Sequence, residues 1–325
     1  MRRDIVELYT LGVDGNTVYV GSDILTHERL YYVIKDNKMI PASQDIIDKI
    51  NIEESKEDYQ DIKRLVESKV SQYIRDNEQR KYPNKLLNIN WDNICIDYNK
   101  NGLYASSASY DVFNNTLNYS LPYEYSRGFL TPQMRAVIDQ VITHEIGHMA
   151  ASELEIERKT ELRMINEMET NIVHITNLVG KTGFLEMRIP IIDEIVLDNG
   201  DSYYRVDKNR EVVENGGRGL EELFNEMETD ERTNNATAPY FGRRLDILTD
   251  GKLRLARFNH SLDTFYSMME EIYSTIGTAR FLLAGIDGYY KAKRTGNEEI
   301  KKEFEEVINK LLDYYEVALA NLGKN

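Results

Sequence analysis

The five-residue run at 144–148, which reads HEIGH, constrains this chain more than any other feature. Residues four positions apart lie on the same face of an α-helix, so His144 and His148 can present two imidazole nitrogens to one ion. Glu145 lies beside them, where it can reach a water molecule without binding the ion itself. The run therefore predicts two ligands of an open Zn²⁺ site and a general base.

The residues before this run indicate a packed helix, which we expect over 132–154. Thr131 is a suitable N-cap, and Pro132 suits the first helical position. Apolar side chains then recur at helical spacing, at Val137, Ile138, Val141, Ile142 and Ile146. The histidines fall beside this apolar stripe, where zinc ligands belong, and Gly147 lets another element approach closely. The alternative is a helix with two surface histidines beside a glutamate.

Composition excludes several classes of partner. The chain has 55 acidic and 40 basic residues and a net charge of -15, whereas nucleic acid and anionic membranes require a cationic surface. The single cysteine, Cys95, excludes an internal disulfide and a cysteine-rich zinc site. No apolar run has the length of a signal peptide or a membrane span, so we expect a cytoplasmic protein, with non-classical export left open.

Hydrophobic periodicity predicts an α+β fold with four parts. They are a small β-rich N-terminal unit at 1–42, a helical connector at 43–86, a catalytic core at 87–232 and a helical C-terminal lobe at 233–325.

Within the core we expect a mixed sheet packed on the 132–154 helix. The strand at 116–121 could add a bound peptide to the sheet, or could be an ordinary sheet strand. A second helix is predicted at 157–179 and a β-hairpin at 184–214, where Asp198, Asn199 and Gly200 signal the turn.

A second motif follows at 220–230, on a helix with an apolar stripe. Residues 225–230 read NEMETD, which resembles the downstream Asn-Glu-x-x-Ser/Thr-Asp element of the thermolysin-like gluzincin metallopeptidases. This resemblance implies a zincin-like core, Zn²⁺ as cofactor and peptide hydrolysis. It implies Glu226 as the third zinc ligand and Asp230 as the carboxylate that orients His144. It covers the two motifs and the order of elements around them, but the segment from His148 to Glu226 is far longer than in thermolysin.

Other residues compete for the third ligand position. Glu222 lies one helical turn before Glu226 but points further from the apolar stripe. Glu167 has a spacing from His148 closer to the usual one, although Asn171 stands where the orienting acid should be. His174 is a further candidate, with a partly buried helical histidine as the alternative. The region 220–231 could also be an acidic amphipathic helix with a solvated face.

A tetrahedral intermediate also needs a donor for its oxyanion. Gluzincins use a Tyr or a His for this, which points to Tyr240 and His260 here. Further candidates are Arg244, Tyr203 and Tyr204.

The expected function is a zinc-dependent endopeptidase that hydrolyses a peptide or protein substrate, with Glu145 as general base. HEIGH also occurs in cytoplasmic regulators that resemble the ImmA/IrrE family and act on a repressor, so a regulatory protease is an alternative. A non-catalytic zinc-binding interaction protein is a second alternative, but a structural zinc site has no use for the intact Glu145.

Overall fold

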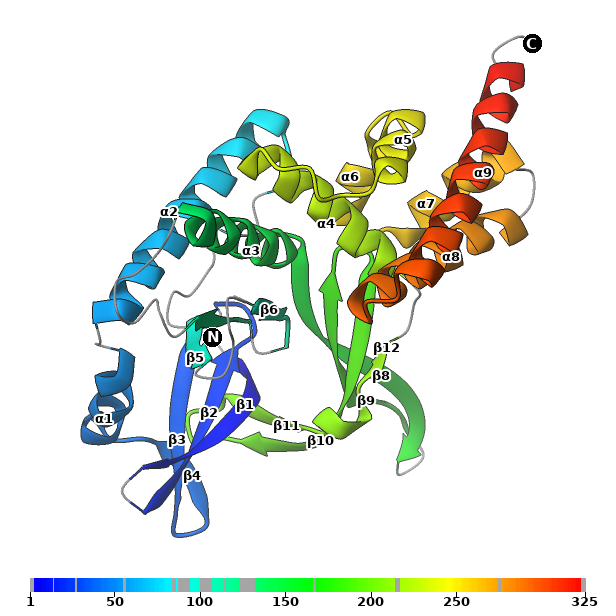
Figure 1. Ribbon diagram of the computed structural model, residues 1–325. Helices are drawn as coiled ribbons and strands as arrows, with labels where there is room; N and C mark the ends of the chain where they lie inside the picture. The colour runs from blue at the N-terminus through cyan, green and yellow to red at the C-terminus, as the bar shows by residue number, and fades with distance from the viewer. Residues whose placement is uncertain are drawn as a thin grey trace.

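The computed structural model is a mixed sheet with helices gathered on one side of it (Figure 1). It describes residues 3–322 except 14, 27, 55–56, 84–85, 87–93, 100–106, 114, 123–131, 166–167, 214–216 and 274–275. Helices and strands are both abundant, which agrees with the predicted α+β class.

The large sheet combines strands from the N-terminal residues with strands from residues 152–213. Its strands run in the order β4 (Lys38–Pro41), β3 (Arg29–Lys35), β2 (Asn16–Asp23), β1 (Asp4–Val13), β11 (Ser202–Val206), β10 (Leu185–Val196), β9 (Met168–Thr182) and β8 (Ser152–Ile165), with β12 (Val212–Val213) also paired to β10. Only β1 and β11 pair in parallel; the other pairs are antiparallel. The β-rich N-terminal residues therefore form strands as predicted, and these continue into the sheet of 152–206.

A smaller sheet lies beside the motif helix. It has the order β5 (Ile94–Asn99), β7 (Thr116–Pro122) and β6 (Ser107–Asp111). β7 pairs on both sides, in parallel with β5 and antiparallel with β6, so the strand at 116–121 has no free edge for a bound peptide. Among the described residues β6 pairs only with β7, and it packs against the motif helix.

The motif helix is α3 (Pro132–Ala150), which begins as predicted and ends before residue 154. Ile138, Ile142, Ile146 and Met149 are buried on it, whereas Val137 is 45% exposed. These side chains pack against Val66, Val70 and Tyr73 of α2 (Glu57–Arg80) and against Leu117 and Tyr119 of β7. The helix is thus held between α2 and the small sheet. The predicted helical connector contains α2 and α1 (Gln44–Glu54).

The helix predicted at 157–179 is wrong, because this segment forms the long hairpin of β8 and β9. The apolar residues that suggested a helical period are interleaved with β-branched residues, which favour strands. Pairing runs from Ser152 with Thr182 to Ile165 with Met168, with a bulge at Glu157 and Arg158. The hairpin that follows, β10 and β11, was predicted correctly, and Gly200 in its turn has a φ of 86°.

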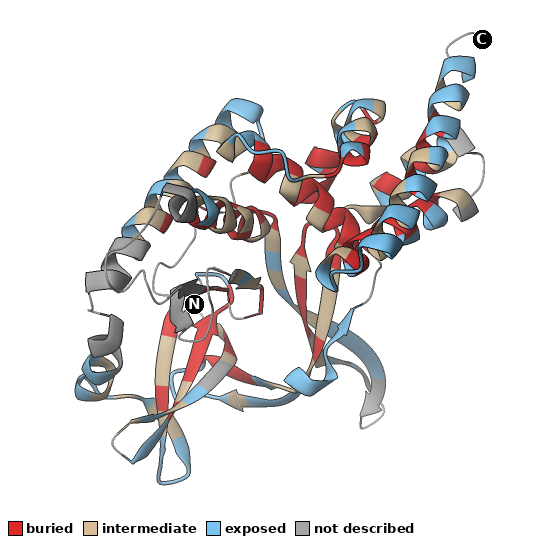
Figure 2. Cartoon of the chain, in the orientation of Figure 1, coloured by how far each residue is buried: buried red, intermediate tan, exposed pale blue. Residues whose placement is uncertain are grey.

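The C-terminal lobe is helical, as predicted. Its helices are α5 (Tyr240–Leu248), α6 (Lys252–Phe258), α7 (Leu262–Tyr273), α8 (Ile276–Arg294) and α9 (Glu298–Leu322). The helix α4 (Arg218–Thr233), in the segment predicted as the catalytic core, packs with them. The apolar stripe of α4 forms the centre of the core of this lobe, and buried residues follow the whole length of α4 in Figure 2. Across the described part of the chain, no helix combines the length and the apolar character that crossing a bilayer requires.

Candidate metal centre

Two histidines and one glutamate converge between α3 and α4. Nε2 of His144 lies 3.1 Å from Nε2 of His148. Oε2 of Glu222 lies 3.3 Å from Nε2 of His144 and 3.6 Å from Nε2 of His148. Among the described residues this is the one group of three or more His, Cys, Asp and Glu side chains close enough to share an ion.

The three separations match what a tetrahedral zinc site requires. Nitrogen and oxygen ligands bind Zn²⁺ at roughly 2.0–2.2 Å, which places tetrahedral ligand atoms about 3.3 Å from one another. The observed separations of 3.1, 3.3 and 3.6 Å scatter around that value. Two imidazoles and a carboxylate are also a donor set that zinc enzymes use, and they leave a fourth position open.

Glu226, the predicted third ligand, faces a different neighbour. Its carboxylate accepts from Nζ of Lys293 at 2.5 Å and from the hydroxyl of Tyr290 at 2.8 Å, both on α8. Glu222 lies one turn closer to the start of α4, about 6 Å along the helix axis. Because α4 packs against both α3 and α8, that one turn decides whether a carboxylate reaches the histidines or α8. The prediction of Glu226 is therefore corrected to Glu222.

Asp230, predicted to orient His144, instead stabilises the loop after α4. Its two oxygens accept from the backbone N–H groups of Thr237 and Ala238 and from the hydroxyl of Thr237, each at 2.7 Å. Asp230 lies two turns beyond Glu222 on α4, and both of its carboxylate oxygens already accept hydrogen bonds from this loop. The structure therefore places Asp230 with this loop and not with His144, in contrast to the prediction.

The carboxylate that orients a histidine is Glu221. Its Oε1 lies 2.9 Å from Nδ1 of His148, and this contact leaves Nε2 of His148 facing His144 and Glu222. A hydrogen bond from the second ring nitrogen to a carboxylate fixes the tautomer and the ring orientation of a metal-binding histidine. Glu221 is only 2% exposed, so its contact with His148 is shielded from water.

A fully buried arginine holds Glu221 in turn. The guanidinium of Arg257, on α6, donates to Oε2 of Glu221 at 2.8 Å and to Oε1 at 2.6 Å. It also donates to the carbonyl of Gly147 on α3 at 2.9 Å, to Oδ1 of Asn225 at 2.9 Å and to Oε2 of Glu228 at 3.2 Å. One side chain therefore ties α3, α4 and α6 together behind the histidines.

The electrostatics of the centre favour a bound cation. Burial alone would lower the pKa of His148, but the carboxylates of Glu222 and Glu221 outweigh it and raise that pKa to about 10. Burial would raise the pKa of Glu221, yet Arg257 and His148 bring it down to about 2. The pKa of Glu222 is also lowered, against burial, by the two histidines. Two ionised carboxylates thus lie beside the imidazoles and favour positive charge there, part of which Arg257 supplies.

Gly147 and Asn225 set how closely α3 and α4 approach. A Cβ atom at Gly147 would overlap the side-chain amide of Asn225. The amide nitrogen of Asn225 donates to the carbonyl of His144 at 2.8 Å. This direct contact between the helices brings Glu221 and Glu222 within reach of the two histidines.

Glu145 lies in the same cleft as the histidines, as predicted. It is 8% exposed, and it lines a cavity of about 360 Å³ together with His144, His148, Glu221 and Glu222. No hydrogen bond or ion pair to its carboxylate occurs within the described ranges. Its carboxylate can therefore accept a proton from a molecule in the cleft.

None of the residues predicted to stabilise an oxyanion lines this cleft. Tyr240 is 69% exposed at the start of α5. His260 contacts the carbonyl of Gly183 at 3.1 Å and the carboxylate of Glu153 at 3.3 Å.

The other candidate oxyanion donors also lie away from the cleft and contact other residues or are buried elsewhere. Arg244 joins α5 to α9 through Asn309, Asp313 and Glu316. Tyr203 is fully buried on β11, and the hydroxyl of Tyr204 donates to Asp4.

Of the other candidates, His174 lies on β9 and pairs with Glu161 at 3.1 Å. Glu167 lies outside the described residues.

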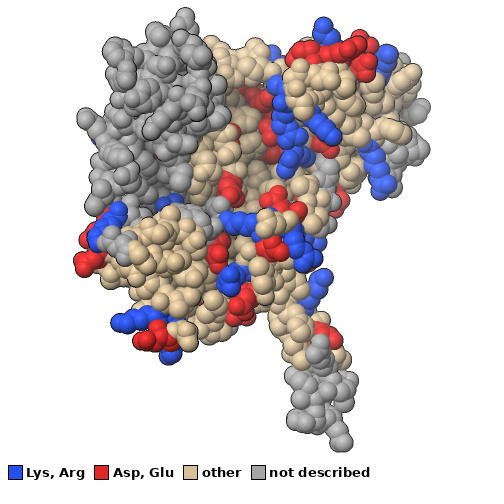
Figure 3. Space-filling model, turned by 60° about the horizontal axis from the view of Figure 1, so that its bottom comes forward, with Lys and Arg blue, Asp and Glu red and all other residues tan. Residues whose placement is uncertain are grey.

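The cleft has an apolar wall and a basic wall. Ala108, Tyr110, Leu185 and Met187 from β6 and β10 line the first, and Arg218 and Arg294 belong to the second. In Figure 3 the molecule is hollowed, with Asp and Glu side chains deep in the hollow and Lys and Arg side chains along one side.

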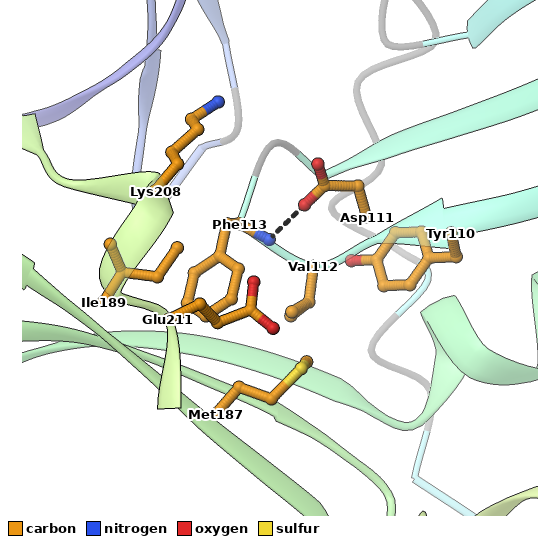
Figure 4. A pocket seen from close by; sticks show the side chains of 8 residues that line it. All are labelled: Tyr110, Asp111, Val112, Phe113, Met187, Ile189, Lys208 and Glu211. Carbon is orange, nitrogen blue, oxygen red and sulfur yellow. Dashed lines mark hydrogen bonds between the residues drawn. The ribbon is translucent and has the colours of Figure 1, made fainter. Parts of the chain in front are cut away.

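A second cavity, of about 230 Å³, continues from the apolar wall and shares Tyr110 and Met187 with the cleft. Figure 4 shows Val112, Phe113 and Met187 facing one another across it, with Lys208 and Glu211 at its sides. The two cavities together give a depression that runs past the metal centre along β6.

No protein-family model, curated protein or solved structure matches this chain. The centre is therefore interpreted from its own geometry and chemistry.

Proposed function

We propose that this protein is a zinc-dependent peptidase with a zincin-like core, in which His144, His148 and Glu222 hold the ion. The observation that carries the proposal is the convergence of these three side chains at tetrahedral separations, with Glu145 beside them in an open cleft. Bound Zn²⁺ would acidify a water molecule and polarise the scissile carbonyl.

The residues of the chain supply the rest of the chemistry. Glu145 removes the proton from the attacking water and later delivers it to the leaving amine, which is the role of a carboxylate held within reach of the reacting atoms. Glu221 keeps the imidazole of His148 in one tautomer, and Arg257 keeps Glu221 ionised and in place.

The substrate would bind as an extended peptide along β6. This strand is the edge of its sheet in the described part of the chain, and Ala108, Ser109 and Tyr110 on it line the cleft. Main-chain groups of an edge strand can pair with an added strand, which suits a peptide better than a compact small molecule. The apolar cavity of Figure 4 would then take one side chain of that peptide.

The test is hydrolysis of a mixed peptide library by the purified chain, with and without a chelator, followed by mass spectrometry. We expect cleavage that a chelator stops and added Zn²⁺ restores. The variant Glu145→Gln should lower cleavage by at least about 100-fold, the lower end of what general acid–base catalysis contributes, while retaining bound zinc. Glu303→Gln, exposed on α9, is the matched control and should cleave like the wild type.

Two results would reject this function. Cleavage that persists in a clean Glu145→Gln preparation would remove Glu145 from the mechanism. Zinc binding without cleavage of any peptide would instead favour a non-catalytic zinc-binding protein.

A further inference from the structure

Two arginines line the metal cleft, and neither has a role in holding the ion. Arg218 is the first residue of α4, and Arg294 is the last residue of α8. Their helices pack against each other, so the two cationic side chains reach the cleft from neighbouring elements. Arg218 lies one turn before Glu222 on the same face of α4, which places it next to a residue of the metal centre.

Within the described ranges, neither arginine forms a hydrogen bond or an ion pair with a carboxylate. This contrasts with other arginines of the helical lobe, since Arg232 pairs with Asp76, Arg254 with Asp246 and Arg257 with Glu221. Acidic residues exceed basic ones by 15 in the chain, so the composition favours arginines that pair with carboxylates.

Asp287 on α8 is the acidic group whose charge interacts with both arginines, but it has a structural role. Its Oδ1 accepts from the backbone N–H of Gly219 at 2.5 Å, at the start of α4. Burial raises the pKa of Asp287 to about 6, against the opposing effects of that hydrogen bond and of Arg218 and Arg294. Asp287 therefore caps α4 and does not neutralise either guanidinium through a direct ion pair.

The position of Arg218 is unfavourable for stability. The N-terminus of a helix carries a partial positive charge, so a cation in the first turn is repelled. Arg294, at the C-terminus of α8, is in a favourable position by the same rule, so only Arg218 is repelled by the dipole of its helix. A half-buried arginine at an unfavourable position, beside a metal ligand and facing a cleft, is explained by an anionic ligand in that cleft.

We propose that Arg218 and Arg294 bind a carboxylate of the substrate beside the metal centre, and that the protein acts on acidic peptides. This inference rests on the proposed peptidase function. A guanidinium matches a carboxylate with two parallel N–H···O bonds, which provides both affinity and register. A polyanion such as nucleic acid does not fit, because the cleft offers two cations on a chain with a net charge of -15.

The carboxylate has two possible sources: an Asp or Glu side chain, or the C-terminus of the peptide. The probes are fluorescent, N-acetylated decapeptides that differ only at one central position, occupied by Glu, Gln, Ala or Lys. Each is made with a free and with an amidated C-terminus. A side-chain carboxylate predicts that the Glu peptides are preferred whether or not they are amidated. If the C-terminal carboxylate is the ligand, every peptide with a free C-terminus should bind more tightly than its amidated form, whatever its central residue.

Binding is measured by anisotropy on the zinc-loaded Glu145→Gln protein, and cleavage is measured on the wild type. Arg218→Gln and Arg294→Gln should each weaken binding of the preferred peptides by about 10- to 100-fold and leave the others within about two-fold, because each removes one charged hydrogen-bonding partner. Arg294→Glu should shift the preference towards the Lys peptides. Arg75→Gln, an exposed arginine on α2, is the matched control and should bind like the wild type.

Equal binding of all the Glu, Gln and Ala peptides, with free and with amidated C-termini alike, would overturn the inference. So would a loss of binding in Arg218→Gln that is the same for peptides with and without the preferred carboxylate, since Arg218 would then not act on that carboxylate. If the wild type cleaves no peptide at all, the peptidase function fails, and the anisotropy series still decides whether the arginines select an acidic ligand.

Discussion

Oε2 of Glu222 lies 3.3 Å from Nε2 of His144, although the whole β8–β10 region separates the two residues in the chain. The contact forms because Asn225 fits directly against Gly147 where α4 meets α3. It makes Glu222 the carboxylate that completes the histidine pair, and it leaves Glu226 one turn further along, in contact with α8.

The assignment of the third ligand leads to the first prediction. Glu222→Ala should lower the affinity for Zn²⁺ by more than about 100-fold, which exceeds the usual effect of losing an outer partner of a metal ligand. Glu226→Ala is the matched control, because it removes the same group one turn away. Its affinity for Zn²⁺ should stay within about ten-fold of the wild-type value. Competition with a zinc-binding dye measures both. A larger loss in Glu226→Ala would return the ligand role to Glu226.

Glu221 provides a second prediction. Glu221→Gln keeps the shape of the side chain but removes the charge that faces His148 and Arg257. Zinc affinity should fall by about 10- to 100-fold, as for other carboxylates behind a metal-bound histidine. The same dye competition measures it, and Glu231→Gln on the same helix is the control. An unchanged affinity would show that His148 does not need Glu221 for its orientation.

The sequence predicted His144, His148 and Glu145 together in one cleft because a single helix positions all three. Its period alone determines which residues share a face. The third ligand could not be predicted in the same way. Whether Glu222 or Glu226 approaches the histidines depends on where α4 meets α3 and α8. Resemblance to a short sequence motif gives no information about how these helices pack.

The buried partners of the site have a recognisable pattern in the sequence. Glu221, Asn225 and Glu228 recur at helical spacing beside the apolar stripe of α4, and all three are buried. A polar row next to a core-facing stripe indicates a buried hydrogen-bonded network, because unpaired polar groups are rarely buried. The error at 157–179 has a different cause: apolar residues recur there at helical spacing, but the β-branched residues between them favour strands.

Arg257 provides a prediction about stability. It is fully buried, and its guanidinium contacts Glu221, Glu228, Asn225 and the carbonyl of Gly147. Arg257→Leu removes the guanidinium that two buried carboxylates share, which should cost about 3–5 kcal/mol of unfolding free energy. Chemical denaturation measures this. Arg158→Leu, at an exposed pair with Asp4, should cost no more than about 1 kcal/mol. Similar costs for the two variants would argue against the buried network.

The contact between Gly147 and Asn225 can be tested by adding one methyl group. Gly147→Ala should stabilise an isolated helix, yet here the new Cβ would overlap the amide of Asn225. We expect a net loss of about 1–3 kcal/mol from overpacking, together with weaker zinc binding as α4 moves away from α3. Gly285→Ala on α8 is the control, because its Cβ would lie 3.2 Å from Cγ1 of Ile308, a much milder contact than the overlap at Gly147. Zinc affinity that survives in Gly147→Ala would separate the metal centre from this helix contact.

Arg218 should trade stability for selectivity, and a single variant can show both. Its charge lies in the first turn of α4, where the helix dipole repels a cation, so Arg218→Gln should raise the unfolding free energy by about 0.3–1 kcal/mol at low salt. The gain should shrink as added salt screens the repulsion. Arg75→Gln, well inside α2, should leave stability unchanged under the same conditions. Denaturant titrations at two salt concentrations measure the effect. If Arg218→Gln destabilises the protein instead, Arg218 supports the fold through contacts of its own, and its place beside Glu222 no longer calls for an anionic ligand.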